Sequence, residues 1–236
     1  MQDFTSTFGN SAADALPAQR AQFIRKTYLL LALAVLAFVA VEAFLFASGA
    51  AGTILSVISA GGQLGWLLVI AAFMGISYLA NRWAMSDVST ATQYLGLGIY
   101  IVAEAVIFVP MIAIAMYASG DASILVQAGI VTLGLFLGLS ATVFLTRSDF
   151  SFLGPILAIG GFVALGVIVA GALFGFSLGS FFAFAMVAFA GTAILYNTSN
   201  VLHRYNTNQH VAASLTLFAS VALLFWYILS IFSSRR

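Results

Sequence analysis

Seven long apolar stretches, joined by short loops, occupy nearly all of this 236-residue chain. A helix needs roughly 20 mostly apolar residues to cross the ~30 Å hydrocarbon core of a bilayer, and each stretch is long enough. The predicted spans cover residues 27–47, 54–80, 92–117, 122–145, 152–175, 180–202 and 210–232. The second span is the least regular, because three glycines and Gln63 interrupt its first half. The chain is therefore predicted to be an all-α polytopic membrane protein.

The composition agrees with this class and excludes several others. The chain is 63% hydrophobic and only 6% charged, whereas the surface of a soluble domain of this size needs many more charged side chains. So few charges leave no basic patch for nucleic acid. The absence of cysteine excludes disulfides and thiol chemistry. With two histidines and no hydrolase, metalloprotease, phosphate-loop or dinucleotide motif, we expect no enzyme activity, no metal centre and no cofactor.

The chain is expected to form one unit with short ends. An N-terminal tail (residues 1–26) precedes a seven-helix transmembrane domain (27–232), and a basic end (233–236) follows it. We expect residues 1–16 to be a mobile tail. Residues 17–26 could form a short helix at the lipid surface or serve only as a basic flank of the first span.

The distribution of Lys and Arg predicts the orientation. Seven spans place the N-terminus and every second loop on one side, and this side carries Arg20, Arg25, Lys26, Arg82, Arg147 and Arg204. The opposite side carries only Arg235 and Arg236. Because basic residues concentrate on the cytoplasmic side, we expect a cytoplasmic N-terminus. The alternative is six spans with one re-entrant segment, which would place both termini inside.

Two carboxylates, Glu42 and Glu104, fall inside the predicted spans. Glu104 lies roughly 16 Å into the third span at 1.5 Å per residue, and Pro110 could kink the same helix nearby. An unpaired carboxyl at this depth is expected to be protonated or to face a hydrated cavity. Glu104 is thus either a cation- or proton-responsive group on a pathway or a neutral acid hydrogen-bonded to a neighbouring helix.

Glu42 lies close to the outer end of the first span. It could reach interfacial water as a capping or snorkelling carboxylate. Alternatively, it could share a site with Glu104, and a hard cation such as Ca²⁺ would suit two carboxylates.

The other concentration of polar residues lies at the end of the sixth span. Asn197, Thr198, Ser199 and Asn200 precede the cytoplasmic boundary, and His203 lies beyond them. Amides and hydroxyls there can hydrogen-bond across helices or to lipid headgroups. His203 and His210 are separated by a loop, and we expect no metal site between them.

Two segments of the chain resemble a known family. They are TRSDFSFLG at 146–154, with Asp149 and Ser151, and LYNTSNVLH at 195–203, with Thr198, Ser199, Asn200 and His203. Together with the segment TNQHVAASLTLF and Pro110, they are similar to the Bax inhibitor-1, or transmembrane Bax inhibitor motif, family. The resemblance covers roughly residues 20–232 and is strongest to a bacterial inner-membrane branch with a member that modulates the membrane AAA protease FtsH.

The resemblance implies a fold and a function. It implies six helices packed around a central, more polar seventh. It also implies a pH-sensitive calcium leak controlled by a pair of aspartates on the last two helices. In this chain the first of those positions is Asn197 and the second is Phe218 or Ala219, and no acidic residue follows Asp149. The paired aspartates are therefore absent, and Glu104 and Glu42 would have to supply any response to ions or protons.

Two functions from different classes follow. The first is a passive, pH-sensitive cation (calcium) leak with Glu104, Glu42 and Asn197 as the pathway candidates. The alternative is a non-transporting accessory protein that binds a larger membrane complex such as the FtsH protease. In both cases the expected surroundings are membrane lipid and a bacterial inner membrane.

Overall fold

The computed structural model describes residues 11–86 and 88–234. Within them the chain forms α1 (Pro17–Ala47), α2 (Ala50–Ala60), α3 (Gly62–Met85), α4 (Thr90–Ser119), α5 (Ser123–Thr146), α6 (Leu153–Phe174), α7 (Gly179–His203) and α8 (His210–Ser234). Seven of these helices are long and apolar enough to cross a membrane, and α2 is too short. The all-α polytopic class is confirmed. Arg235 and Arg236, to which the orientation argument referred, lie outside the described residues.

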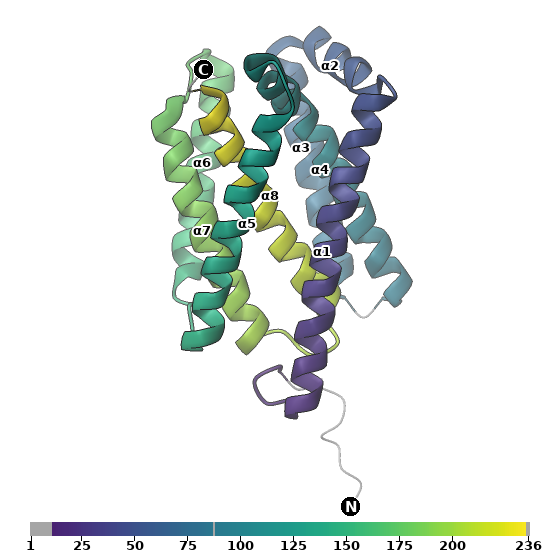
Figure 1. The fold of residues 1–236 in the computed structure, drawn as a ribbon, viewed down its shortest axis with the longest axis vertical. Helices are drawn as coiled ribbons and strands as arrows, with labels where there is room; N and C mark the ends of the chain where they lie inside the picture. Colours follow the sequence, from purple (N-terminus) through teal and green to yellow (C-terminus); the bar gives the residue numbers. More distant parts are fainter. Residues whose placement is uncertain (1–10, 87, 235–236) are drawn as a thin grey trace, which may run out of the picture.

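The predicted bounds of the second span were wrong. A single helix over 54–80 does not form, because the chain breaks between α2 and α3, where Gly62 adopts a positive φ of 54°. A Cβ on Gly61 would lie 2.6 Å from the Cα of Gly65, so this close approach requires glycine. The membrane crossing is Leu64–Met85, and α2 lies across one end of the bundle (Figure 1).

The N-terminal segment also differs from expectation. Residues 17–26 are the first turns of α1, which Pro17 starts, so a separate interfacial helix was wrong. Ala12 is fully buried, and its N–H donates a 2.8 Å hydrogen bond to the carbonyl of Tyr205. Residues 11–16 are thus anchored on the loop between α7 and α8, contrary to the mobile tail expected there. Residues 1–10 of that tail lie outside the described residues.

The last helix occupies the centre of the bundle. In the most apolar 18-residue stretch of α8, 61% of the residues are buried. The corresponding share for α3 is 6%. It packs against α1, α3, α4, α5 and α7. The more peripheral α6 packs on α7, yet its Ala164 shares a small apolar cluster with Tyr227 of α8. The predicted arrangement of six helices around a central seventh is confirmed.

The ends of the described chain lie at opposite ends of the bundle. The start of α1 is at the bottom of Figure 1 and the end of α8 is at the top. This arrangement fits seven crossings and not six crossings with a re-entrant segment. We call the end that holds the start of α1 the N-terminal end of the bundle. It also holds the loops that follow α3, α5 and α7, because each crossing reverses the chain direction.

Candidate functional site in the helix bundle

Asn197 lies at a small cavity between α3, α7 and α8. Its Nδ2 donates a 2.8 Å hydrogen bond to Ser220 Oγ and a longer one, 3.5 Å, to the carbonyl of Thr216. The cavity has a volume of about 210 Å³ and is lined by Asn81, Asn197, Leu215, Thr216, Ala219, Ser220 and Leu223. Asn197 is six residues from the end of α7, which is about 9 Å at 1.5 Å per residue. The cavity therefore lies in the half of the bundle nearer its N-terminal end.

A chain of polar groups leads from this cavity to Glu104. Asn81 lines the cavity and donates a 2.9 Å hydrogen bond from Nδ2 to the carbonyl of Ser77, one turn earlier on α3. The Tyr100 hydroxyl interacts with the side chains of both Ser77 and Glu104. Asn81, Ser77, Tyr100 and Glu104 are thus neighbouring polar groups between α3 and α4, which we call the polar path, and Ser77 Oγ within it has no hydrogen-bond partner among the described residues.

Glu104 is the inner end of the polar path. Only 7% of its surface is exposed, and its Oε2 has no hydrogen-bond partner among the described residues. It lies fourteen residues after the start of α4, or about 21 Å along the axis. Burial of a charged carboxylate at such depth is costly, so a group of this kind usually marks an ion or proton route.

Aromatic side chains fill the bundle one turn beyond Glu104. The Phe108 ring lies 4.9 Å from the ring of Trp226, 5.1 Å from that of Phe38 and 5.8 Å from that of Phe225. Phe108 itself is 1% exposed. We call Phe38, Phe108, Phe225 and Trp226 the aromatic plug. These rings lie between the level of Glu104 and the far end of the bundle. Pro110 follows within α4, which remains one helix from Thr90 to Ser119, and the expected kink stays a prediction.

Glu42 does not behave as expected. It is only 7% exposed, and within the part of the chain that the structure describes neither carboxylate oxygen has a hydrogen-bond partner, so the snorkelling or capping role was wrong. The structure also does not form the shared site with Glu104. In the parallel helices α1 and α4 the rings of Phe38 and Phe108 lie side by side, 5.1 Å apart. Glu42 is four residues beyond this level and Glu104 is four residues before it, so about 12 Å of height separates them.

The family motif residues join the loop after α5 to the end of α7. Asp149 accepts hydrogen bonds from the N–H and hydroxyl of Ser151 at 2.9 and 3.1 Å. These contacts, above all the backbone one, lower the pKa of Asp149. Ser199 Oγ accepts from the N–H of Phe150 at 2.9 Å and lies 3.4 Å from both Asp149 Oδ1 and His203 Nδ1. This arrangement fixes the loop against α7.

The remaining motif residues are buried beside this loop. Thr198 is fully buried, and its Oγ1 lies 3.4 Å from Ser140 Oγ of α5. Asn200 is 9% exposed, and its Oδ1 has no hydrogen-bond partner in residues 11–86 and 88–234. No group of three or more His, Cys, Asp or Glu side chains converges in the part of the chain that the structure describes.

Sequence reasoning missed several residues of the site. Four of them were not predicted from the sequence: Ser77, Asn81, Tyr100 and Ser220. A signal was available for Asn81, which is an amide near the end of an otherwise apolar span. The contact between Asn197 and Ser220 joins residues 23 positions apart on different helices, so no local pattern could reveal it. The site brings Asn197 and Glu104 to the two ends of one polar series and leaves Glu42 outside it.

Comparison with known proteins identifies the family. A family model described as inhibitor of apoptosis-promoting Bax1 matches residues 20–236. Protein LIFEGUARD 4 of Arabidopsis thaliana is 30% identical over 228 residues, which cover 93% of this chain and 87% of the relative. The chain belongs to the Bax inhibitor-1 family.

Two other relatives are less identical to this chain or match it over a shorter region. Bax inhibitor 1 of Schizosaccharomyces pombe is 35% identical over 118 residues, or 47% of this chain and 42% of the relative. An uncharacterized protein of Pseudomonas aeruginosa is 28% identical over 171 residues, or 70% of this chain and 72% of the relative. The relatives of this chain thus include bacterial as well as eukaryotic proteins.

Phe218 and Ala219, the two positions that the sequence resemblance offers for a second acid, lie in different surroundings. Phe218 is 2% exposed and packs its ring 6.0 Å from that of Tyr100, within the core. Ala219, in contrast, lines the cavity that Asn197 occupies. Of the two positions, Ala219 is thus the one at the cavity, and Ser220 beside it accepts the hydrogen bond from Asn197.

Proposed function

We propose that this Bax inhibitor-1 family protein is a passive, pH-sensitive cation leak, with calcium as the first ion to test. The observation that carries the proposal is the polar path, which connects the cavity at Asn197 with the buried carboxyl of Glu104. A cation crossing a bilayer needs oxygen ligands in place of water, and amides, hydroxyls and a carboxylate supply them.

We assign the block to ion passage in the closed state to the aromatic plug. Four aromatic side chains pack against one another beyond Glu104, and an apolar constriction of this kind blocks ions by excluding water. In the proposed mechanism, ionisation of Glu104 attracts water and a cation into the polar path, and movement of α8 relative to α4 opens the plug. Because Asn197 cannot titrate and Glu42 lies outside the polar path, we assign the response to pH to Glu104.

The proposal includes an orientation and a location. We place the N-terminal end of the bundle in the cytoplasm and the protein in a bacterial inner membrane. The supports are the six basic residues at that end and the bacterial members among the relatives. The cavity at Asn197 then lies on the cytoplasmic side of the plug.

Flux in liposomes tests the leak. The purified protein is reconstituted in vesicles that contain a calcium dye, and uptake is measured from pH 5 to pH 8. We expect flux above that of empty vesicles, reduced severalfold by Glu104→Gln and by Asn197→Leu. Thr192→Val, which alters a hydroxyl bonded only to its own helix on α7, is the matched control and should leave flux unchanged.

Absence of flux at every pH would contradict the leak. It would favour the accessory role in which the protein binds a membrane complex such as the FtsH protease. Mild-detergent purification then provides the second measurement, because an accessory protein should retain a stoichiometric partner.

A further inference from the structure

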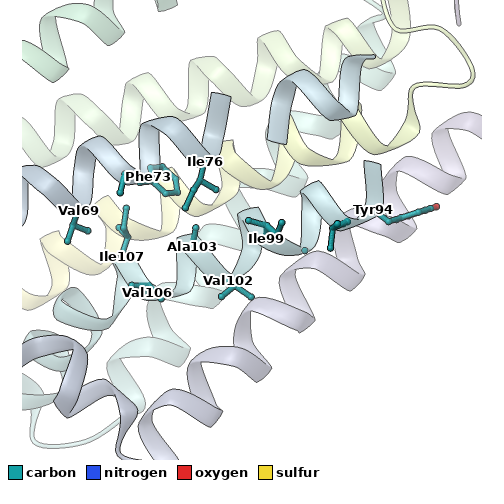
Figure 2. A pocket seen from close by; sticks show the side chains of 12 residues that line it. Val69, Phe73, Ile76, Tyr94, Ile99, Val102, Ala103, Val106 and Ile107 are labelled. Atoms are coloured by element: carbon teal, nitrogen blue, oxygen red, sulfur yellow. The ribbon is translucent and has the colours of Figure 1, made fainter. Parts of the chain in front are cut away.

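The outer surface of the bundle carries a long apolar groove between α3 and α4. Its volume is about 760 Å³, and apolar side chains line nearly all of it (Figure 2). Gly98 is exposed in the groove, and a Cβ built on it would meet no atom within 4 Å. The missing side chain and the small Ala103 and Ala72 leave the space open.

The length of the groove suits an acyl chain of one leaflet. On α4 it extends from Tyr94 to Ile107, which is about 20 Å at 1.5 Å per residue. One leaflet contributes about half of the ~30 Å hydrocarbon core. Tyr94 lies four residues after the start of α4, so the groove begins near the N-terminal end of the bundle and ends near the middle of the membrane.

Polar and basic groups gather at the end of the groove that Tyr94 occupies. The Tyr94 hydroxyl is hydrogen-bonded to Nε2 of His210 at 3.0 Å, and Figure 2 shows this hydroxyl directed away from the apolar side chains. Lys26 of α1 is close enough to His210 for their charges to interact. Arg82 lies in the last turn of α3, near the level where Trp83 packs on Gly96 of α4.

We propose that the groove between α3 and α4 holds one acyl chain of an anionic phospholipid, with the phosphate at Tyr94, His210 and Lys26. The apolar length accommodates the chain, and the charge of Lys26 complements a phosphate and an anionic headgroup at the membrane surface. This site is separate from the cavity at Asn197 and does not depend on the proposed leak.

Lipid titration followed by native mass spectrometry tests the site. The full-length protein is delipidated in detergent and titrated with phosphatidylglycerol or phosphatidylcholine of identical acyl chains. We expect the first phosphatidylglycerol to bind at least about fivefold more tightly than the first phosphatidylcholine, the factor that one basic residue near a headgroup supplies. Equal binding of the two lipids would overturn the proposal without any variant.

Two variants with matched controls locate the lipid. Gly98→Phe fills the groove and should weaken the first phosphatidylglycerol at least tenfold. Gly134→Phe makes the same change at an exposed glycine of α5 with open space around it and should bind like the wild type. Lys26→Gln should weaken binding about fivefold, whereas Arg147→Gln, at the same end of the bundle, should not.

The outcomes distinguish the groove from general lipid adhesion. Unchanged binding in Gly98→Phe, or equal losses in Gly98→Phe and Gly134→Phe, would overturn the proposal. If Gly98→Phe does not fold, Ala103→Phe fills the same groove and takes its place.

Discussion

Asn197 donates a 2.8 Å hydrogen bond to Ser220, and this contact ties α7 to the central helix α8 beside the cavity. The donor is an amide at a position where the family resemblance implies a carboxylate. A neutral pair holds the two helices together at every pH, whereas two facing carboxylates would repel each other once both were ionised. In this protein the hydrogen bond between Asn197 and Ser220 therefore does not change with pH, and we call it the α7–α8 joint. Any pH-dependent movement of the helices depends on other groups.

We predict that this joint contributes about 1 kcal/mol to stability, the usual net value of a hydrogen bond. Ser220→Ala and Asn197→Ala should each lower the melting temperature, and the double variant should lose less than the sum of the two because both remove the same bond. Thermal unfolding in detergent measures all three. Strict additivity would show that the two side chains do not interact in the folded protein.

The hinge between α2 and α3 should depend on glycine. A Cβ on Gly65 would lie 2.5 Å from the carbonyl oxygen of Ile58, and backbone atoms cannot move aside as a side chain can. Gly65→Ala should therefore destabilise the protein by roughly 1–3 kcal/mol, as overpacking does. Gly75→Ala on the same helix meets no atom within 4 Å and should be neutral or stabilising by up to about 1 kcal/mol. Similar melting temperatures for the two variants would contradict the close approach.

Asp149 should stabilise the loop between α5 and α6 in a pH-dependent way. Its pKa is lowered from the usual 3.8, mainly by the Ser151 N–H, so the folded state favours the charged form. A lowered pKa contributes stability above the ordinary value, and this stability is lost as the pH falls through the lower folded value. Asp149→Asn should thus melt below the wild type at pH 7, and the difference should shrink below about pH 3.8.

The control for this prediction keeps the loop but removes a weaker contact. Ser151→Ala eliminates the hydroxyl donor to Asp149 and leaves the stronger backbone donor in place. It should reduce the melting temperature less than Asp149→Asn does. A melting difference between Asp149→Asn and the wild type that stays constant from pH 7 to pH 3 would count against the role of the carboxylate.

The sequence predicts the fold of this protein better than it predicts the site. The length of the apolar stretches is enough to predict the seven crossings. The sequence of α8 is apolar with scattered small polar residues because the helix is buried in the centre of the bundle. The break at Gly61 and Gly62 was visible as irregularity, but its geometry depends on how α2 packs against α3. Hydropathy reports whether a segment prefers lipid and says little about local turns within it.

The site depends on contacts between distant helices. Depth along the chain identified Glu104 as buried and wrongly placed Glu42 near water, because depth alone does not reveal what covers a side chain. The polar path joins α3 to α4 through Ser77 and Tyr100, residues that look ordinary in an apolar helix. The polar path forms because α3 packs against α4. The periodicity of the sequence does not show which helices of this chain are neighbours.

The aromatic plug should be the barrier to ions. Phe108 packs edge-on to Phe38 and Trp226, and its ring is the central one of the cluster. Phe108→Leu keeps the site apolar and removes less buried volume than Phe→Ala, so it should cost less than about 3 kcal/mol. The smaller, non-planar side chain should nevertheless leave a gap through which water can pass. We therefore expect faster calcium flux than in the wild type, the opposite of the effect of Glu104→Gln.

Phe162→Leu is the matched control. The Phe162 side chain is 78% exposed on α6, so this substitution makes the same change in side-chain volume away from the plug. It should leave the flux unchanged. The double variant Phe108→Leu with Glu104→Gln tests whether the plug and Glu104 act on the same pathway. If the plug is the barrier and Glu104 attracts the cation, the flux of the double variant should fall below that of Phe108→Leu alone. Equal flux in Phe108→Leu and the wild type would mean that ions, if they cross, pass by another route.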